Sequence, residues 1–288
     1  AIALHPNDAK AYYYLGNFWF DKRQYNEAIA CWEQSVKTDD RFPTAFRNLS
    51  LAYYNKRNDA DKALQFMEKA FSLDNTDSRV LMELDQLYKR LNRSHRERLH
   101  LLEEHLYLVE QRDDLYLERI TLYNLLGDYA KAKELLQRHQ FHPWEGGEGK
   151  VIQQYIICNI ELAKRAIGSG EPDDALQLLC EAENYPSNLG EGKLAGAQEN
   201  DIHYWKGIVY EKMGDKIAAD EYFKRAVKGM SEPVQAIFYN DPQPDKIFYQ
   251  GLAWRKLNNP EKAAAIFQCL IDFGLTHITD EISIDYFA

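Results

Sequence analysis

The stretch Asn200–Ala226 decides the fold, and it reads NDIHYWKGIVYEKMGDKIAADEYFKRA. Small and large residues recur in it at offsets of three, nine, four and three: Gly207, Tyr210, Ala219, Phe223 and Ala226. Small residues allow two helices to approach closely, and large side chains fill the groove between them. Gly214-Asp215 separates the two halves of the pattern. The stretch therefore predicts two packed helices joined by a short turn.

This pattern resembles the tetratricopeptide repeat, a helix–turn–helix unit of about 34 residues. Similar patterns cover essentially the whole chain, and the first four begin near residues 9, 43, 78 and 113. The third unit is degenerate, and its second helix is expected as one highly charged segment, Arg96–Glu110. The resemblance implies an all-α fold: a right-handed superhelix of about seven helix pairs, with partial repeats at both ends.

Three insertions interrupt the later repeats, at residues 141–150, 187–199 and 230–244. Glycine, proline or polar residues dominate each of them, which is typical of loops. Each insertion precedes a first helix, so all three should project from the same edge of the stack. They would form either a lip along a groove or solvated surface loops. We divide the continuous solenoid accordingly into residues 1–140, with repeats one to four, and residues 141–288, with repeats five to seven.

Composition and charge restrict the function classes. The net charge of -10 disfavours a general nucleic-acid or anionic-membrane binder, since such binding needs a basic surface. No apolar run approaches the length of a transmembrane span. The four cysteines lie in apolar helical patterns without a C-x-x-C pair: Cys31, Cys158, Cys180 and Cys269. We expect buried, reduced thiols and a cytoplasmic location.

The ends of the sequence predict a fragment of a longer protein. Ala1 and Pro6 have the spacing of the last alanine and the final proline of a repeat, and Thr276–Ala288 resembles a loop and a helix cut short. Severed ends could drive self-association, because terminal repeats normally need a polar cap.

Two short segments carry a second resemblance. Phe141–Lys150 (FHPWEGGEGK) and Ile284–Ala288 (IDYFA) are similar to segments in the C-terminal repeat region of large bacterial proteins. Members of that family carry an N-terminal β-rich domain of unknown function and are often discussed alongside carbohydrate metabolism. The resemblance implies that this chain is the helical half of such a protein. The chain would then bind its own N-terminal domain, or the chain would be the accessory half of a carbohydrate-active enzyme.

The tetratricopeptide resemblance also implies where a partner would bind. First helices line the concave face, and the two positions just before the small residue point into it. Aromatic residues occupy these pairs at the two ends of the chain: Tyr13-Tyr14, Tyr204-Trp205 and Phe248-Tyr249. Aromatic side chains supply large contact areas at low entropic cost, so we predict that they bind a peptide or protein. The alternative is that several of these rings pack against the neighbouring repeat.

A clamp for a C-terminal carboxylate is a sharper hypothesis. Asn17, Asn48 and Arg79 match three of the clamp positions in residue type. Tyr13, however, replaces a basic residue, and Glu83 stands where a cation is required. A glutamate would repel the carboxylate of the ligand, so the sequence favours a structural role for Asn48.

Nothing in the sequence predicts catalysis, a metal or a cofactor. Gly146–Lys150 lacks the spacing and the Ser or Thr of a phosphate-binding loop. His139 and His142, with Glu145 and Glu148, do not match a zinc helix. We therefore predict a non-catalytic scaffold that binds a peptide or protein along its concave face.

Overall fold

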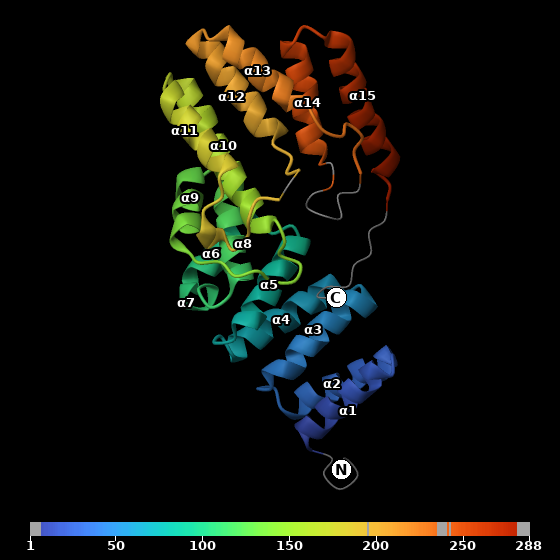
Figure 1. Cartoon of the computed structure of the whole chain (residues 1–288). Helices are drawn as coiled ribbons and strands as arrows, with labels where there is room; N and C mark the ends of the chain where they lie inside the picture. Colours follow the sequence, from blue (N-terminus) through green and yellow to red (C-terminus); the bar gives the residue numbers. More distant parts are fainter. Residues whose placement is uncertain (1–6, 195, 235–240, 242, 281–288) are drawn as a thin grey trace. The chain divides into compact units, whose positions relative to one another are not determined.

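The computed structural model describes residues 7–194, 196–234, 241 and 243–280 (Figure 1). All regular elements in these residues are helical, which confirms the predicted all-α fold. In chain order they are α1 Ala9–Asp21, α2 Tyr25–Thr38, α3 Pro43–Arg57, α4 Ala60–Leu73, α5 Ser78–Arg90, α6 His95–Glu104, α7 Leu106–Val109, α8 Asp113–Leu125, α9 Tyr129–Arg138, α10 Lys150–Ser169, α11 Pro172–Glu183, η1 Ser187–Leu189, α12 Asn200–Met213, α13 Lys216–Ala226, α14 Pro244–Lys256 and α15 Pro260–His277.

Consecutive helices pack as pairs, as the repeat pattern predicts. The contacts are most extensive within α1/α2, α3/α4, α10/α11, α12/α13 and α14/α15. Within three of these pairs the same joint recurs, with a glycine on the first helix and an aromatic ring sixteen positions later: Gly16 and Trp32, Gly207 and Phe223, Gly251 and Phe267. A Cβ atom on Gly207 would lie 2.5 Å from the Phe223 ring, so glycine is required for this close approach.

The turns between paired helices use residues suited to their backbone geometry. Asn58 ends α3 and Gly214 ends α12, both in the left-handed region with φ of 53° and 84°. In each case an aspartate follows directly: Asp59 caps α4 and Asp215 caps α13. A left-handed residue followed by a side-chain cap stops one helix and starts the next within two residues.

The described chain forms two compact units, which meet in the sequence between Leu122 and Tyr123, inside α8. The first unit contains α1 to α7, and the second contains α9 to α15. All three insertions lie in the second unit.

The structure corrects the expected bounds of several segments. Lys150 begins α10 instead of ending the first insertion, and the second insertion, expected as a loop, begins with the short 3-10 helix η1. The helix expected over Arg96–Glu110 is interrupted at His105, which separates α6 from α7. The interruption allows Leu102 and Leu108 both to be fully buried, while the His105 ring packs against Phe71. Pro244 begins α14 instead of ending the third insertion, because proline suits the first turn of a helix. Helix α15 continues to His277, beyond the expected start of a loop at Thr276.

The expectation of four buried thiols was wrong for three of them. Cys158 is buried, Cys31 and Cys269 are half-buried, and Cys180 is exposed; all four are free thiols. Burial raises the pKa of the Cys158 thiol to about 12. No helix in the described part of the chain is both long and apolar enough to cross a membrane.

Candidate functional site

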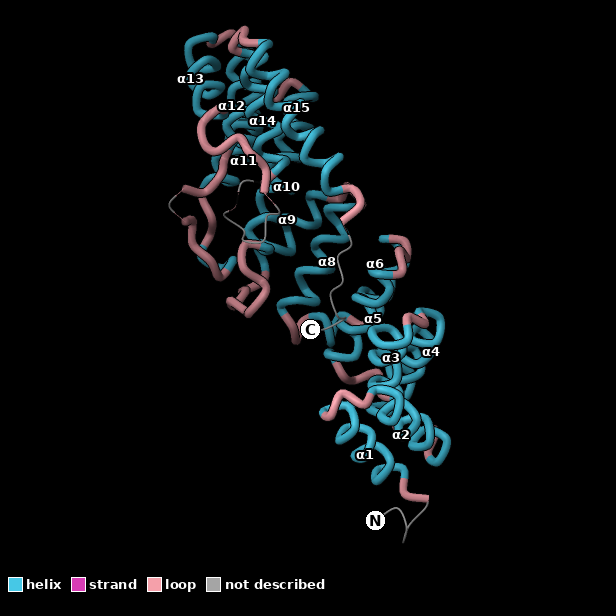
Figure 2. The backbone as a smooth tube through the Cα atoms, turned by 90° about the vertical axis from the view of Figure 1, so that its right-hand side faces the viewer, coloured by secondary structure: helices cyan, strands magenta, loops and turns pink. Residues whose placement is uncertain are grey.

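The three insertions contact one another, as their shared position before a first helix predicts. The Phe141 backbone N–H donates to the Asn188 carbonyl at 2.8 Å, which joins the first insertion to the second. The Gln198 side chain joins the second to the third: its amide N–H donates to the Asp241 carbonyl at 2.9 Å, and its oxygen accepts from the Gln243 N–H at 3.1 Å. Figure 2 shows the long loops near α10. Hydrogen bonds therefore join the described parts of the three insertions within the second unit.

Side-chain amides fasten the second insertion to the end of α9, and the start of α12 to the end of α13. Asn188 donates to the carbonyls of Leu136 and His139, both at 2.7 Å. At the start of α12, the buried Asn200 donates to the carbonyls of Ala226 and Lys228, both at 2.8 Å. These carbonyls lie at or just beyond the ends of α9 and α13, where the helix itself supplies no donors.

Glu191 of the second insertion caps α10. Its two carboxylate oxygens accept from the Gly149 N–H at 2.9 and 3.1 Å. Gly149 is the N-cap residue of α10 and has φ of 72°, a conformation that favours glycine. A carboxylate at a helix N-terminus is stabilised by the exposed N–H groups and by the helix dipole. Glu191 thus fixes the second insertion against the helix that follows the first.

Between the insertions and the first helices α10, α12 and α14 lies a groove with a volume of about 480 Å³, which we call the insertion groove. It is lined by Glu148, Gly149, Lys150, Ile152, Gln153, Ile156, Ile157, Ile160, Glu161, Tyr185, Glu191, Gly192, Leu194, Ala197, Gln198, Asp201, Gln243, Asp245, Lys246 and Tyr249. This volume is in the range of known ligand sites, roughly 300–1,000 Å³.

One face of the wall that α10 contributes is apolar, although Lys150, Gln153 and Glu161 of the same helix also line the groove. Ile152, Ile156 and Ile160 recur every four residues and so share one face of the helix. Ile156 is half-buried, as is Ile157 beside it, so both retain surface that a ligand could cover. Leu194 of the second insertion adds a side chain that is 46% exposed.

One ion pair of the groove lining joins two helices. Lys246 of α14 pairs with the buried Asp201 of α12, and it lies 3.9 Å from Asp245. In the middle of α12, away from the groove lining, Lys206 is buried and pairs with Glu183 of α11. Burial disfavours the charged form of Glu183, but hydrogen bonds from His203 and Lys206 outweigh it and lower the pKa of this carboxyl to about 2.

The predicted aromatic residues of repeats six and seven divide into core and surface. Tyr204 is only 9% exposed and packs against Phe223 and Tyr249, so its ring offers little surface to a partner. Trp205 is half-buried and donates its indole N–H to the Tyr249 hydroxyl at 3.3 Å. Tyr249 lines the insertion groove. Phe248 is 45% exposed but is not among the residues that line it.

Asn17 and Asn48 take part in a chain of side-chain hydrogen bonds between the first two repeats. Asn17 accepts from the Trp32 indole at 3.0 Å and from the Asn48 amide at 3.1 Å. Both asparagines therefore join neighbouring helices of the first two repeats. Tyr13 packs against the Phe42 ring, whereas Tyr14 is 66% exposed.

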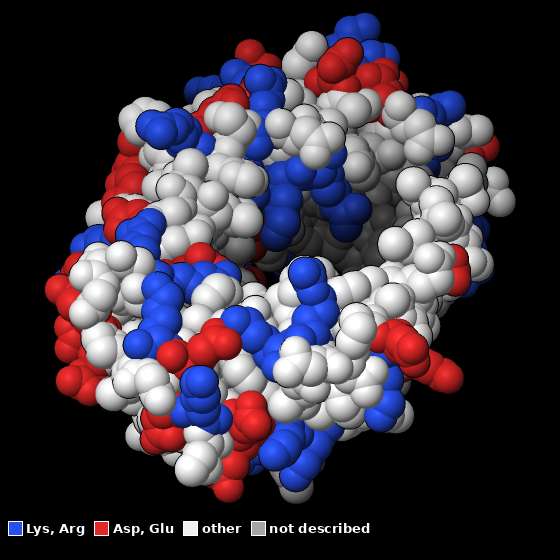
Figure 3. Space-filling model, turned by 90° about the horizontal axis from the view of Figure 1, so that it is seen from above, with Lys and Arg blue, Asp and Glu red and all other residues white. Residues whose placement is uncertain are grey.

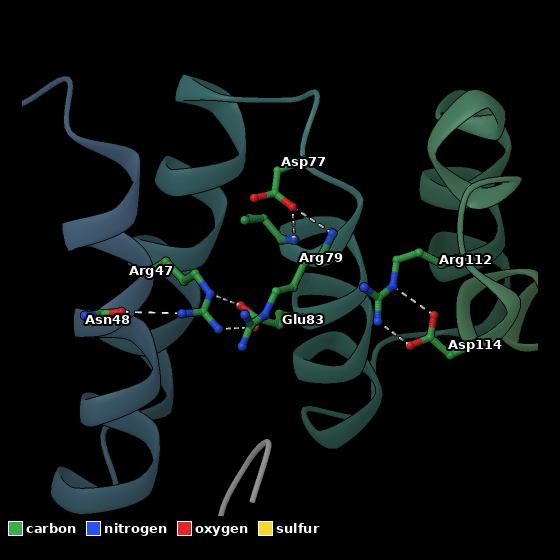
Figure 4. Close-up of polar contacts among 8 residues, drawn as sticks. Arg47, Asn48, Asp77, Arg79, Glu83, Arg112 and Asp114 are labelled. Atoms are coloured by element: carbon green, nitrogen blue, oxygen red, sulfur yellow. Dashed lines mark hydrogen bonds and ion pairs between the residues drawn. The ribbon is translucent and has the colours of Figure 1, made fainter. Parts of the chain in front are cut away.

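Arg79, the third residue of the clamp hypothesis, pairs with Glu83 (Figure 4). The Glu83 carboxylate is fully buried and accepts hydrogen bonds from Arg47 of α3 and Arg79 of α5. A carboxylate of the protein itself therefore already engages the Arg79 side chain, which is 62% exposed. The geometry argues against a carboxylate clamp built on Asn17, Asn48 and Arg79.

Sequence reasoning missed most of the groove. The isoleucines of α10 and the Asp201–Lys246 pair carry no recognisable motif, because each is ordinary for a helix on its own. The position of the insertions was the available signal.

Acidic and basic side chains are interspersed on the face drawn in Figure 3. Among the residues that the structure describes, no His, Cys, Asp and Glu side chains are grouped so that they could hold a metal ion.

Comparisons with known proteins agree with this architecture. Residues 9–42 and residues 201–228 each match a model of the tetratricopeptide repeat. A tetratricopeptide repeat protein from Parabacteroides merdae is 14% identical over 93% of this chain and 93% of its own, with a TM-score of 0.50. A structure of Naa15/Naa10 bound to HypK-THB is also 14% identical, over 97% of this chain and 39% of that chain, with a TM-score of 0.53.

These low identities show the fold alone. Of the two segments on which the expected resemblance to a bacterial family with a β-rich domain rests, Ile284–Ala288 lies outside the described residues. The direct matches to the repeat models lie in the first repeat and in the stretch Asn200–Ala226 with its flanks. The chain therefore contains tetratricopeptide repeats, and its helix pairs have the fold of that family.

Proposed function

We propose that this chain is a non-catalytic peptide-binding scaffold whose principal site is the insertion groove. The observation that carries the proposal is a cavity of about 480 Å³ bounded by three first helices and by three insertions. The resemblance to tetratricopeptide proteins predicts binding on the face that first helices line. The ligand is a short segment of a partner protein.

The groove has the features that peptide recognition needs. The isoleucine side chains of α10 offer apolar contact, and the surrounding carboxylates, lysines and tyrosine hydroxyls can fix the orientation of a ligand. The mutual hydrogen bonds of the insertions hold the walls together before a ligand arrives, which lowers the entropic cost of binding.

A substitution that fills the groove tests the proposal. Gln153 is exposed on α10 and lines the groove, so Gln153→Trp should occupy its volume without disturbing the core. We would probe the purified chain against an array of short synthetic peptides of random sequence. Affinities of the best peptides would then be measured by fluorescence anisotropy.

We expect Gln153→Trp to weaken the best peptides at least tenfold, or about 1.4 kcal/mol. Gln177→Trp is the matched control, because Gln177 is exposed on α11 outside the groove. Equal losses in both variants, or no loss in Gln153→Trp, would place the binding site elsewhere and refute the proposal.

A further inference from the structure

The charges that line the insertion groove specify its ligand more closely. We propose that the groove selects a peptide segment that combines aliphatic side chains with lysine or arginine. This inference rests on the proposed function, and it adds the chemistry of the ligand.

Isoleucines of α10 and a leucine of the second insertion form the apolar part of the groove. Ile156 and Ile157 are half-buried in the free protein, and Leu194 is 46% exposed. Burying these surfaces against branched or straight aliphatic side chains removes apolar area from water. A wholly polar peptide would leave them exposed.

The groove lining contains more carboxylates than cationic side chains. Five acidic residues line the groove, against two lysines: Glu148, Glu161, Glu191, Asp201 and Asp245, against Lys150 and Lys246. Several acids already have partners within the protein. Glu161 pairs with Lys164, and Glu191 accepts from the N-terminus of α10.

Glu148 and Asp245 are the carboxylates best placed to meet a ligand. Both are exposed, and they come from two different walls, the first insertion and α14. Lys246 does not neutralise Asp245 fully, because it also pairs with the buried Asp201. The lining therefore retains negative charge, which attracts cationic side chains and disfavours acidic peptides.

The test compares two double charge reversals that change the net charge equally. Glu148→Lys/Asp245→Lys reverses the groove carboxylates. Asp220→Lys/Glu221→Lys is the control, on the exposed side of α13 and away from the groove. Circular dichroism would verify that both variants are folded. Each would then be probed with the peptide array and with the best wild-type peptides at low and high NaCl.

We expect groove-dependent peptides, defined as those lost in Gln153→Trp, to be enriched in Lys or Arg together with Leu, Ile or Val. The groove reversal should weaken them about tenfold and the control less than about twofold, with the difference reduced at high salt. Groove-dependent peptides that are neutral or acidic, or equal effects of both reversals, would overturn this inference alone. An array with no groove-dependent peptide would overturn the proposed function as well.

Discussion

Gly207 lies at the point where the two helices of a repeat come closest. The Phe223 ring of α13 fills the space that a side chain on Gly207 would occupy. Gly16 stands in the same relation to Trp32, and Gly251 to Phe267. The absence of a side chain at this position therefore sets the distance between the paired helices, and the ring locks it.

Substitution of this glycine should be destabilising despite the higher helix propensity of alanine. In Gly207→Ala the new Cβ would approach the Phe223 ring to 2.5 Å, so the ring or the helix must move. We expect the free energy of unfolding to fall by about 1–3 kcal/mol, as for other overpacked cores. The midpoint of urea denaturation, followed by circular dichroism, measures this change.

Gly168→Ala is the matched control on α10. Nothing lies within 4 Å of a Cβ built on Gly168, and the residue is exposed in a helix. Alanine should therefore raise stability there by about 0.4–1 kcal/mol. If Gly207→Ala were equally stabilising, the packing argument for the repeat joint would be wrong.

At the scale of the element, charged side chains join helices in the third and fourth repeats. Arg98 of α6 is almost fully buried, and it donates to Asp85 of α5 and Glu118 of α8 at 2.6–3.0 Å. Burial raises the pKa of Asp85 to about 6, although hydrogen bonds from Arg98 and its charge oppose this shift. The cluster joins α5, α6 and α8 through buried ion pairs, and each of its charges depends on the others.

Removing Arg98 should leave Asp85 buried without its principal partner, whereas Glu118 keeps Lys89 at 2.8 Å but loses one of its two cations. We expect Arg98→Met to lower the free energy of unfolding by about 3–5 kcal/mol near pH 7. Arg96→Met, at an exposed position of the same helix, should change it by about 0.5 kcal/mol or less.

The pH dependence identifies the cause. A buried carboxyl with a raised pKa is harder to ionise in the folded state than in the unfolded state. It therefore lowers the free energy of unfolding at high pH, and this loss disappears as the pH falls to the unfolded-state pKa. The deficit of Arg98→Met relative to wild type should therefore shrink as pH falls from 7 towards 4. Unfolding by urea at several pH values tests this, and a deficit independent of pH would indicate lost packing instead of unpaired charge.

At the scale of the whole molecule, the division into two units predicts which helices a destabilising substitution affects. Each repeat contacts mainly its neighbours, so stability in repeat proteins is approximately a sum of local terms. The insertions add hydrogen bonds within the second unit, between segments that are more than 40 residues apart. We expect the second unit to respond to a perturbation as one body.

Hydrogen exchange measures this response directly. Gly207→Ala should accelerate amide exchange in α12 and α13 and in their neighbours α10, α11 and α14. Exchange in α1 to α4, within the first unit, should remain unchanged. Uniform acceleration over both units would show that the chain opens as a single cooperative body.

The sequence by itself determined the repeats and their joints. Helical periodicity and the glycine–aromatic spacing are local, because each repeat folds mainly within its own length and needs only residues a few turns apart. The same local reasoning placed the insertions before first helices. It misjudged the Arg96–Glu110 segment, since the break at His105 depends on which side chains the neighbouring helices can bury.

Only the tertiary structure decided which of these residues face a site. Tyr204 and Trp205 are adjacent in the sequence, yet one packs in the core and the other is half-buried beside Tyr249. Glu191 and Gly149 are 42 residues apart, and no periodicity relates them. The insertion groove exists because three loops meet, and the meeting of distant segments is determined by packing between repeats, which local sequence patterns do not encode.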